Sequence, residues 1–189
     1  MMRYALSLSW GLSLLAATAA CIAAPRMPPT VPPGTTPAAW ITHDIDLDLR
    51  GLPHGYSCNA LWYKFRDVLL AIGARPYMEI TPYHCPPNDK GASGRSPTVH
   101  LRFQTLSPTG AAEAQWADVN AVTRTVELGP GHPASLNAQD CGLLQQIEST
   151  LFSSLNLKMQ SGNLSCPRPL KGTAFELTVQ SLQPPSGHG

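Results

Sequence analysis

CNALWYKFRDVLLAIGARPYMEITPYHC, residues 58–85, and CGLLQQIESTLFSSLNLKMQSGNLSC, residues 141–166, are the two stretches that decide the fold of this 189-residue chain. Each stretch begins and ends with a cysteine. Counted from the first cysteine, both have apolar residues at positions +3, +10, +11 and +14, and both have a methionine seven positions before the second cysteine. Shared spacing of this kind predicts two copies of one structural unit.

The first copy is predicted to have the order strand, helix, strand, strand. In the first strand Ile45, Leu47 and Leu49 alternate with aspartates, which is the period of a strand with one face in water. In the helix the apolar residues follow helical spacing, with Ser57 as the N-cap and Gly73 at the end. The predicted elements are a strand at 41–50, a helix at 58–73, and strands at 76–83 and 97–106.

The second copy repeats this order. Asn137 can cap a helix in which Leu144, Ile147, Leu151 and Leu155 line one side. This helix contains Cys141 near its start, as the first helix contains Cys58. The predicted strands of this copy are 119–128, 157–164 and 173–182.

The flanking sequences support the duplication. LRFQTLSP (101–108) follows the first cysteine pair, and LTVQSLQP (177–184) follows the second. Upstream of the pairs, LDL and then VEL each lead into glycine, proline and histidine. We therefore predict an α+β domain built by tandem duplication of a β-α-β-β unit, with about six strands and two helices packed on the sheet. The predicted domain is 39–183, its repeats are 39–108 and 119–183, and Met78 should superpose on Met159 and Leu101 on Leu177.

The repeat also predicts how four of the five cysteines pair. A helix and the strand after it run antiparallel, so the first residue of the helix lies near the far end of the strand. Cys58 and Cys85 occupy these two places in the first copy, and Cys141 and Cys166 occupy them in the second. In an oxidising compartment two disulfides, one in each copy, are expected.

The N-terminal segment is typical of an exported protein. Residues 1–20 have one basic residue, Arg3, then an apolar run and small residues, as a signal peptide has. Thr18-Ala19-Ala20-Cys21 resembles a bacterial lipobox with threonine where leucine is usual, so lipidation of Cys21 and simple cleavage are both open. Residues 21–38 form a proline-rich linker, and 184–189 a polar, flexible tail. The expected location is extracytoplasmic, either periplasmic or secreted, or alternatively as an outer-membrane lipoprotein.

Composition excludes some partners. The formal net charge is +1 and only 13% of residues are charged, so a nucleic-acid-binding surface is not expected. After the leader no stretch approaches 18 apolar residues, so no transmembrane span is expected in the mature chain.

Two clusters of metal-ligating residue types have simpler interpretations. Asp44, Asp46 and Asp48 are spaced as in a calcium loop, but the glycine and glutamate that such a loop requires are missing, which favours a polar strand face. The zinc-type set His54, Cys58, His84 and Cys85 competes with the predicted disulfide. Neither cluster is predicted to bind metal.

A third set of residues suggests an enzyme. His43, His100, Glu127 and Glu176 fall on four predicted strands. The tandem units resemble in topology the βαβββ units of the vicinal-oxygen-chelate superfamily, with one strand fewer in each. That resemblance implies a metal held by strand residues in a cleft between the repeats. It gives the alternative function, a metal-dependent enzyme or small-ligand binder.

The favoured function is a non-enzymatic binding or envelope-associated module, with no catalytic residue and no cofactor. Its partner is expected to be another protein or an envelope component. Five aromatic residues gather around the first helix and the strand after it: Tyr56, Trp62, Tyr63, Tyr77 and Tyr83. Most are expected in the core or at its rim, and Trp62, Tyr77 and Tyr83 would make the contact if they are exposed.

Overall fold

A computed structural model describes residues 32–52, 56–85, 96–110, 119–155, 157–164, 166 and 175–185. The signal-peptide prediction, Cys21 and most of the predicted linker and tail lie outside these residues. The elements are β1 (Thr36–Asp48), α1 (Cys58–Ala71), β2 (Glu79–Tyr83), β3 (Thr98–Pro108), β4 (Val119–Leu128), η2 (Ala138–Asp140), α2 (Cys141–Gln146), η3 (Ile147–Phe152), β5 (Lys158–Asn163) and β6 (Glu176–Gln183).

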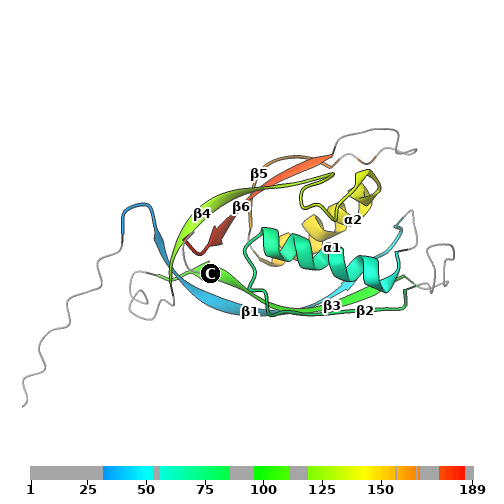
Figure 1. The fold of residues 1–189 in the computed structure, drawn as a ribbon, viewed down its shortest axis with the longest axis horizontal. Helices are drawn as coiled ribbons and strands as arrows, with labels where there is room; N and C mark the ends of the chain where they lie inside the picture. The colour runs from blue at the N-terminus through cyan, green and yellow to red at the C-terminus, as the bar shows by residue number, and fades with distance from the viewer. Residues whose placement is uncertain are drawn as a thin grey trace, which may run out of the picture.

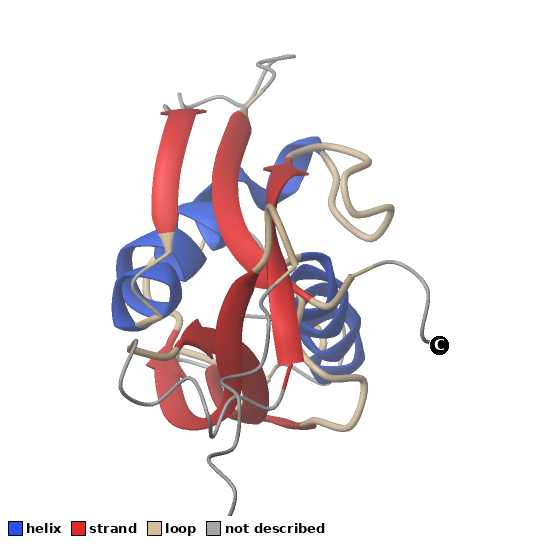
Figure 2. Cartoon of the chain, turned by 90° about the vertical axis from the view of Figure 1, so that its left-hand side faces the viewer, coloured by secondary structure: helices blue, strands red, loops and turns tan. Residues whose placement is uncertain are grey.

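The six strands form one antiparallel sheet in the order β2-β3-β1-β4-β6-β5. The sheet bends between β1 and β4, so its two three-stranded halves face each other with the helices between them (Figure 1). Figure 2 shows the same arrangement from the side. The predicted α+β class, with six strands and two helices packed on the sheet, is confirmed.

In the sheet, the two halves, 32–110 and 119–185, are joined by three residue pairs between β1 and β4. Thr36 pairs with Ala121, Pro37 with Asn120 and Ala38 with Val119. Val119 lies 83 positions after Thr36, and Ala121 lies 83 positions after Ala38. If residues 83 positions apart are exchanged, the first pair therefore becomes the third. The β1–β4 junction therefore has the register of a two-fold axis passing through Pro37 and Asn120.

The same exchange relates the outer strands. Ile45 of β1 pairs with Leu101 of β3, and Leu128, which is 83 positions after Ile45, pairs with Leu177 of β6. Leu49 lies beyond the end of β1, so this register relates Leu128 to Ile45 and not to Leu49 of the LDL stretch. Met78 packs against the core whereas Met159 is 44% exposed, so the environments of this pair differ.

Local signals set the helix boundaries. The Ser57 side chain accepts a hydrogen bond from the Ala60 N–H, and α1 ends before Gly73, whose φ of 88° suits glycine. Asn137 accepts from the Gln139 N–H as predicted, but the second helix is a succession of 3-10, α and π turns. Of its apolar stripe, Leu144, Ile147 and Leu151 are buried and Leu155 is half-buried.

The core lies between the helices and the inner face of the sheet. Leu47 and Leu49 are buried there, whereas Asp44, Asp46 and Asp48 are on the outer face, as the alternation predicted. β1 begins at Thr36, so it takes in the last residues of the predicted linker. A small second cluster of buried residues, Ala38, Leu106 and Ala121, fills the bend of the sheet.

Both predicted disulfides are present. Cys58 is bonded to Cys85 and Cys141 to Cys166, with sequence separations of 27 and 25. Each joins the first residue of an α-helix to the segment just after the second strand of the same half. No other pairing is compatible with these bonds.

Candidate functional site

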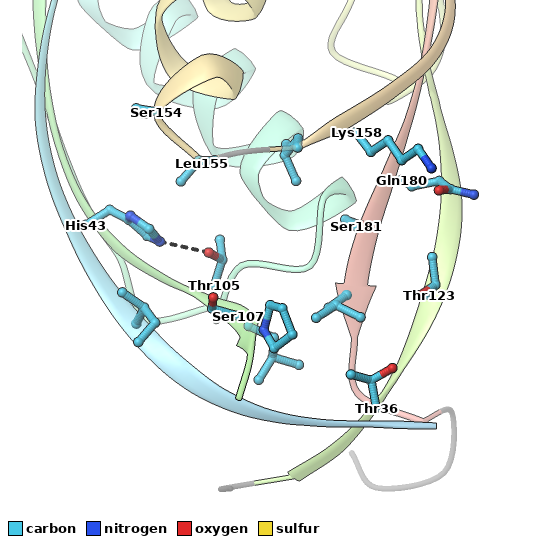
Figure 3. Close-up of a pocket in the computed structure, with 15 residues that line it drawn as sticks. Thr36, His43, Thr105, Ser107, Thr123, Ser154, Leu155, Lys158, Gln180 and Ser181 are labelled. Carbon is cyan, nitrogen blue, oxygen red and sulfur yellow. Dashed lines mark hydrogen bonds between the residues drawn. The ribbon is translucent and has the colours of Figure 1, made fainter. Parts of the chain in front are cut away.

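A hollow on the inner face lies in the bend of the sheet, between its two halves and below the end of the second helix (Figure 3). Its volume is about 640 Å³, within the range of small-molecule sites. We call it the groove. It is lined by Thr36, Ile41, His43, Thr105, Leu106, Ser107, Pro108, Thr123, Ser154, Leu155, Leu157, Lys158, Gln180, Ser181 and Leu182.

The groove is open because one side chain is short. In β6, Gln183 pairs with Val122 and donates a hydrogen bond from its side-chain amide to the Ala71 carbonyl at the end of α1, at 2.9 Å. In β3, Ser107 pairs with Ala39, the residue that the two-fold register relates to Val122. Serine is too short to reach the end of the second helix as Gln183 reaches α1. Gln183 therefore contacts α1, whereas Ser107 lines the groove.

His43 points into the groove from β1. Its Nε2 is 2.8 Å from the Thr105 hydroxyl, and its ring lies 5.1 Å from that of Phe103. Figure 3 shows this pair on one wall. Burial lowers the pKa of His43 below 6.5, because the charged ring would lose water. At neutral pH the imidazole is therefore uncharged and acts as a hydrogen-bonding group.

The opposite wall carries the charge of the groove. Lys158 of β5 is exposed and pairs across strands with Gln180 of β6, beside which Figure 3 shows it. No carboxylate is among the described residues that line the groove, and within the described chain Lys158 has no ion-pair partner. With His43 neutral, the lining has a net positive charge.

The four strand residues of the enzyme hypothesis do not converge. His43 lies in the groove, whereas His100 contacts Asp46 at 3.0 Å and Asp44 at 3.8 Å among exposed side chains. Glu127 and Glu176 line a separate hollow of about 220 Å³ beside Gly129. In the described ranges no group of three or more histidines, cysteines or acids could hold a metal, so the convergence that the alternative hypothesis requires is not found there.

The other two clusters also have structural roles. Asp44, Asp46 and Asp48 follow an exposed strand face and contact His100 and Arg50 instead of closing a loop. Cys58 and Cys85 are joined to each other, which removes both thiolates from the zinc-type set; His54 lies outside the described residues.

Polar side chains that the sequence analysis did not single out join the two halves. Lys64 of α1 donates to Asp140 Oδ2 at 2.7 Å and to the Ser135 carbonyl, also at 2.7 Å. The side chains of Lys64 and Asp140 are only 10% and 0% exposed. The sequence contains a signal for this buried lysine, because Lys64 falls on the apolar stripe of the helix, three positions after Leu61 and four before Val68.

Two further donors satisfy the same carboxylate. The Tyr56 hydroxyl donates to Oδ1 at 3.0 Å, and the Asn137 N–H donates to Oδ2 at 2.7 Å. Burial, the charge of Asp140 and this hydrogen bond all raise the pKa of Tyr56, so the phenol keeps its proton. We call these three side chains and two backbone groups, centred on Lys64 and Asp140, the clasp. Its burial and full pairing indicate a structural role.

The aromatic residues do not form one patch. Tyr56 is buried and Trp62 is half-buried against Tyr63. Tyr63, Tyr77 and Tyr83 are 50%, 92% and 47% exposed, so the expectation that most of the five lie in the core or its rim was wrong. Tyr77 precedes β2 and Tyr83 ends it, which places them at opposite ends of that strand.

Comparisons of the chain with protein-family models, curated proteins and solved structures found no match. Among the residues that the structure describes, no helix has the length and apolar character needed to cross a membrane. Two disulfides in a small domain are typical of proteins from oxidising compartments.

Proposed function

We propose that this protein is an exported, non-enzymatic binding module whose site is the groove. One observation carries the proposal: a hollow of about 640 Å³, apolar but rich in hydroxyl groups, lies where the two halves meet. Sites for small molecules have this mixture of apolar walls and a few polar groups, and they favour junctions between structural units. The proposal joins the favoured non-enzymatic module with the small-ligand binder of the alternative hypothesis, whose site was a cleft between the two repeats.

Export belongs to the same proposal. Residues 1–20 act as the signal peptide, and the protein is placed outside the cytoplasm either in soluble form or through a lipid on Cys21. The two disulfides support this location because they persist in oxidising compartments. The proline-rich residues 25–35 then act as a spacer before β1.

A neutral fluorescent apolar probe tests the site. Nile red is expected to bind the oxidised protein saturably, with a rise in fluorescence. Ser107→Trp places a large ring in the groove and should weaken binding at least about tenfold, the effect of blocking a well-formed apolar pocket. Ser149→Trp, on the exposed face of the second helix, is the matched control and should leave binding unchanged.

Circular dichroism establishes that both variants are folded. Equal binding of Nile red by the two variants would place the site elsewhere and overturn the proposal.

We also propose that the two halves descend from one duplicated β-α-β-β unit. The register supports this: residues 83 positions apart are related in β1 and β4, and the same interval separates Cys58 from Cys141. Ala38 and Ala121, related in this way, are both fully buried. The shorter second copy then results from deletions after the helix and before its last strand.

A circular permutant tests this relation. If the halves are related by a two-fold axis, the gap from the end of β6 to the start of β1 equals the gap from the end of β3 to the start of β4. Residues 109–118 bridge the second gap, so a flexible linker of the same length should bridge the first. A chain that starts in 111–118 and carries this linker is expected to fold with both disulfides.

The measurement is peptide mapping together with the urea midpoint. The control is a permutant opened between Val179 and Gln180, in the middle of β6, which should not fold because it interrupts a strand paired on both sides. If the linked permutant also fails with this linker and with one twice as long, the two-fold relation is wrong.

A further inference from the structure

We propose that the groove binds a single-chain amphiphile that bears one carboxylate, with the head group at Lys158 and the chain against the apolar floor. The inference rests on the proposed function, because it names the ligand class of the same site. Three features of the lining lead to it: the placement of its charge, the placement of its apolar groups and its hydrogen-bonding groups.

Charge selects the sign of the head group. Lys158 is the ionised side chain of the lining, and no described carboxylate faces it across the groove. A cationic ligand would meet uncompensated repulsion there, and an anionic ligand would meet attraction. A single lysine charge matches one negative charge, which a carboxylate supplies, better than the two of a phosphate monoester.

Apolar groups select the rest of the ligand. Leu106 and Leu182 lie at the bend of the sheet, and Leu155 and Leu157 lie at the end of the second helix. A hydrocarbon chain against these side chains gains about 0.8 kcal/mol for each buried methylene, which is the main source of affinity at such a site. The volume of about 640 Å³ accommodates a chain of medium length and its head group.

Hydrogen bonding fixes which end of the ligand lies where. The Gln180 amide stands beside Lys158 on β6 and can donate to a carboxylate oxygen. The last carbonyls of the second helix, near Ser154 and Leu155, form a negative pole that disfavours an anion at that end. The head group therefore belongs at the Lys158 wall and the chain at the helix end.

The test uses three probes with the same eight-carbon chain, each below its micelle concentration: octanoate, octyl glucoside and octyltrimethylammonium. Binding is measured by displacement of Nile red from the oxidised protein. Octanoate is expected to bind about three- to tenfold more tightly than octyl glucoside, and the cation more weakly than both. The preference should shrink as salt rises from about 0.01 M to about 0.5 M, because a charge at the rim is screened.

Variants identify the residue responsible. Lys158→Gln should bring the affinity for octanoate down to that for octyl glucoside, and Lys158→Arg should retain the preference for octanoate. Arg50→Gln removes the same charge at an exposed place outside the groove and is the matched control.

The two levels of the proposal fail differently. Equal affinity for octanoate and octyl glucoside, or no effect of Lys158→Gln, would overturn the carboxylate inference while the groove remains a binding site. If none of the probes binds, or if Ser107→Trp leaves all three affinities unchanged, the groove is not the site and the proposed function fails as well.

Discussion

Reduction of both disulfides is expected to unfold the protein at 25 °C. The bonds close loops with sequence separations of 27 and 25, and chain entropy assigns about 3.5 kcal/mol to each. Together they amount to about 7 kcal/mol, against a total stability of about 5–15 kcal/mol for a domain of this kind. The free energy of unfolding should be measured by urea titration, followed by circular dichroism, with and without dithiothreitol.

Single-bond variants separate the two contributions. Cys58→Ala/Cys85→Ala and Cys141→Ala/Cys166→Ala should each lower the free energy of unfolding by about 3–4 kcal/mol. Oxidised dithiothreitol in the same buffer is the control for the reagent. A reduced protein that keeps nearly the urea midpoint of the oxidised one would show that the sheet and clasp suffice, and would contradict this prediction.

Lys64→Met is expected to lower the free energy of unfolding by about 3–5 kcal/mol. The substitution keeps the apolar stem of the side chain but leaves the Asp140 carboxylate buried with its charge uncompensated. Arg50→Met, which breaks the exposed ion pair with Asp48, should cost less than about 1 kcal/mol, and it is the matched control. Urea unfolding of the oxidised proteins measures both.

A second substitution tests the reason for the loss. Lys64→Met/Asp140→Asn removes both charges. The amide keeps an oxygen that can accept from the Asn137 N–H, and its NH2 can donate to the Tyr56 hydroxyl, which then acts as an acceptor. This double variant should be more stable than Lys64→Met alone. If it is less stable, the cost of Lys64→Met comes from lost packing, and the electrostatic explanation is wrong.

Much of the fold follows from short-range signals in the sequence. Ser57, Cys58 and Gly73 act within one helix, and each predicted disulfide depends on the antiparallel course of a helix and the next strand. Strand order depends on distant pairings that no local pattern reveals. The junction of Pro37 with Asn120 joins residues far apart in the chain, one of them in the predicted linker.

The candidate site was harder to predict for the same reason. His43 was singled out as a metal ligand, yet its partner is the Thr105 hydroxyl, brought near by the register of β1 and β3. The opening itself depends on the difference between Ser107 and Gln183, which matters only once each lies opposite a helix end. Lys64 on an apolar stripe was visible in the sequence, but its partner, Asp140, comes from the other half.

Both disulfides lie within a half, and neither crosses the β1–β4 junction, which has mechanical consequences. If the chain were pulled from its ends, the halves would separate by breaking the three pairs of the junction and the clasp, while each half stayed covalently closed. The disulfides would keep two segments from extending, the one between Cys58 and Cys85 and the one between Cys141 and Cys166. Fully extended, these segments would have contour lengths of about 90 Å and about 85 Å. A domain anchored at one end to an envelope would thus lengthen in two steps. Its halves would separate first, and the two loops would extend only after the disulfides are reduced.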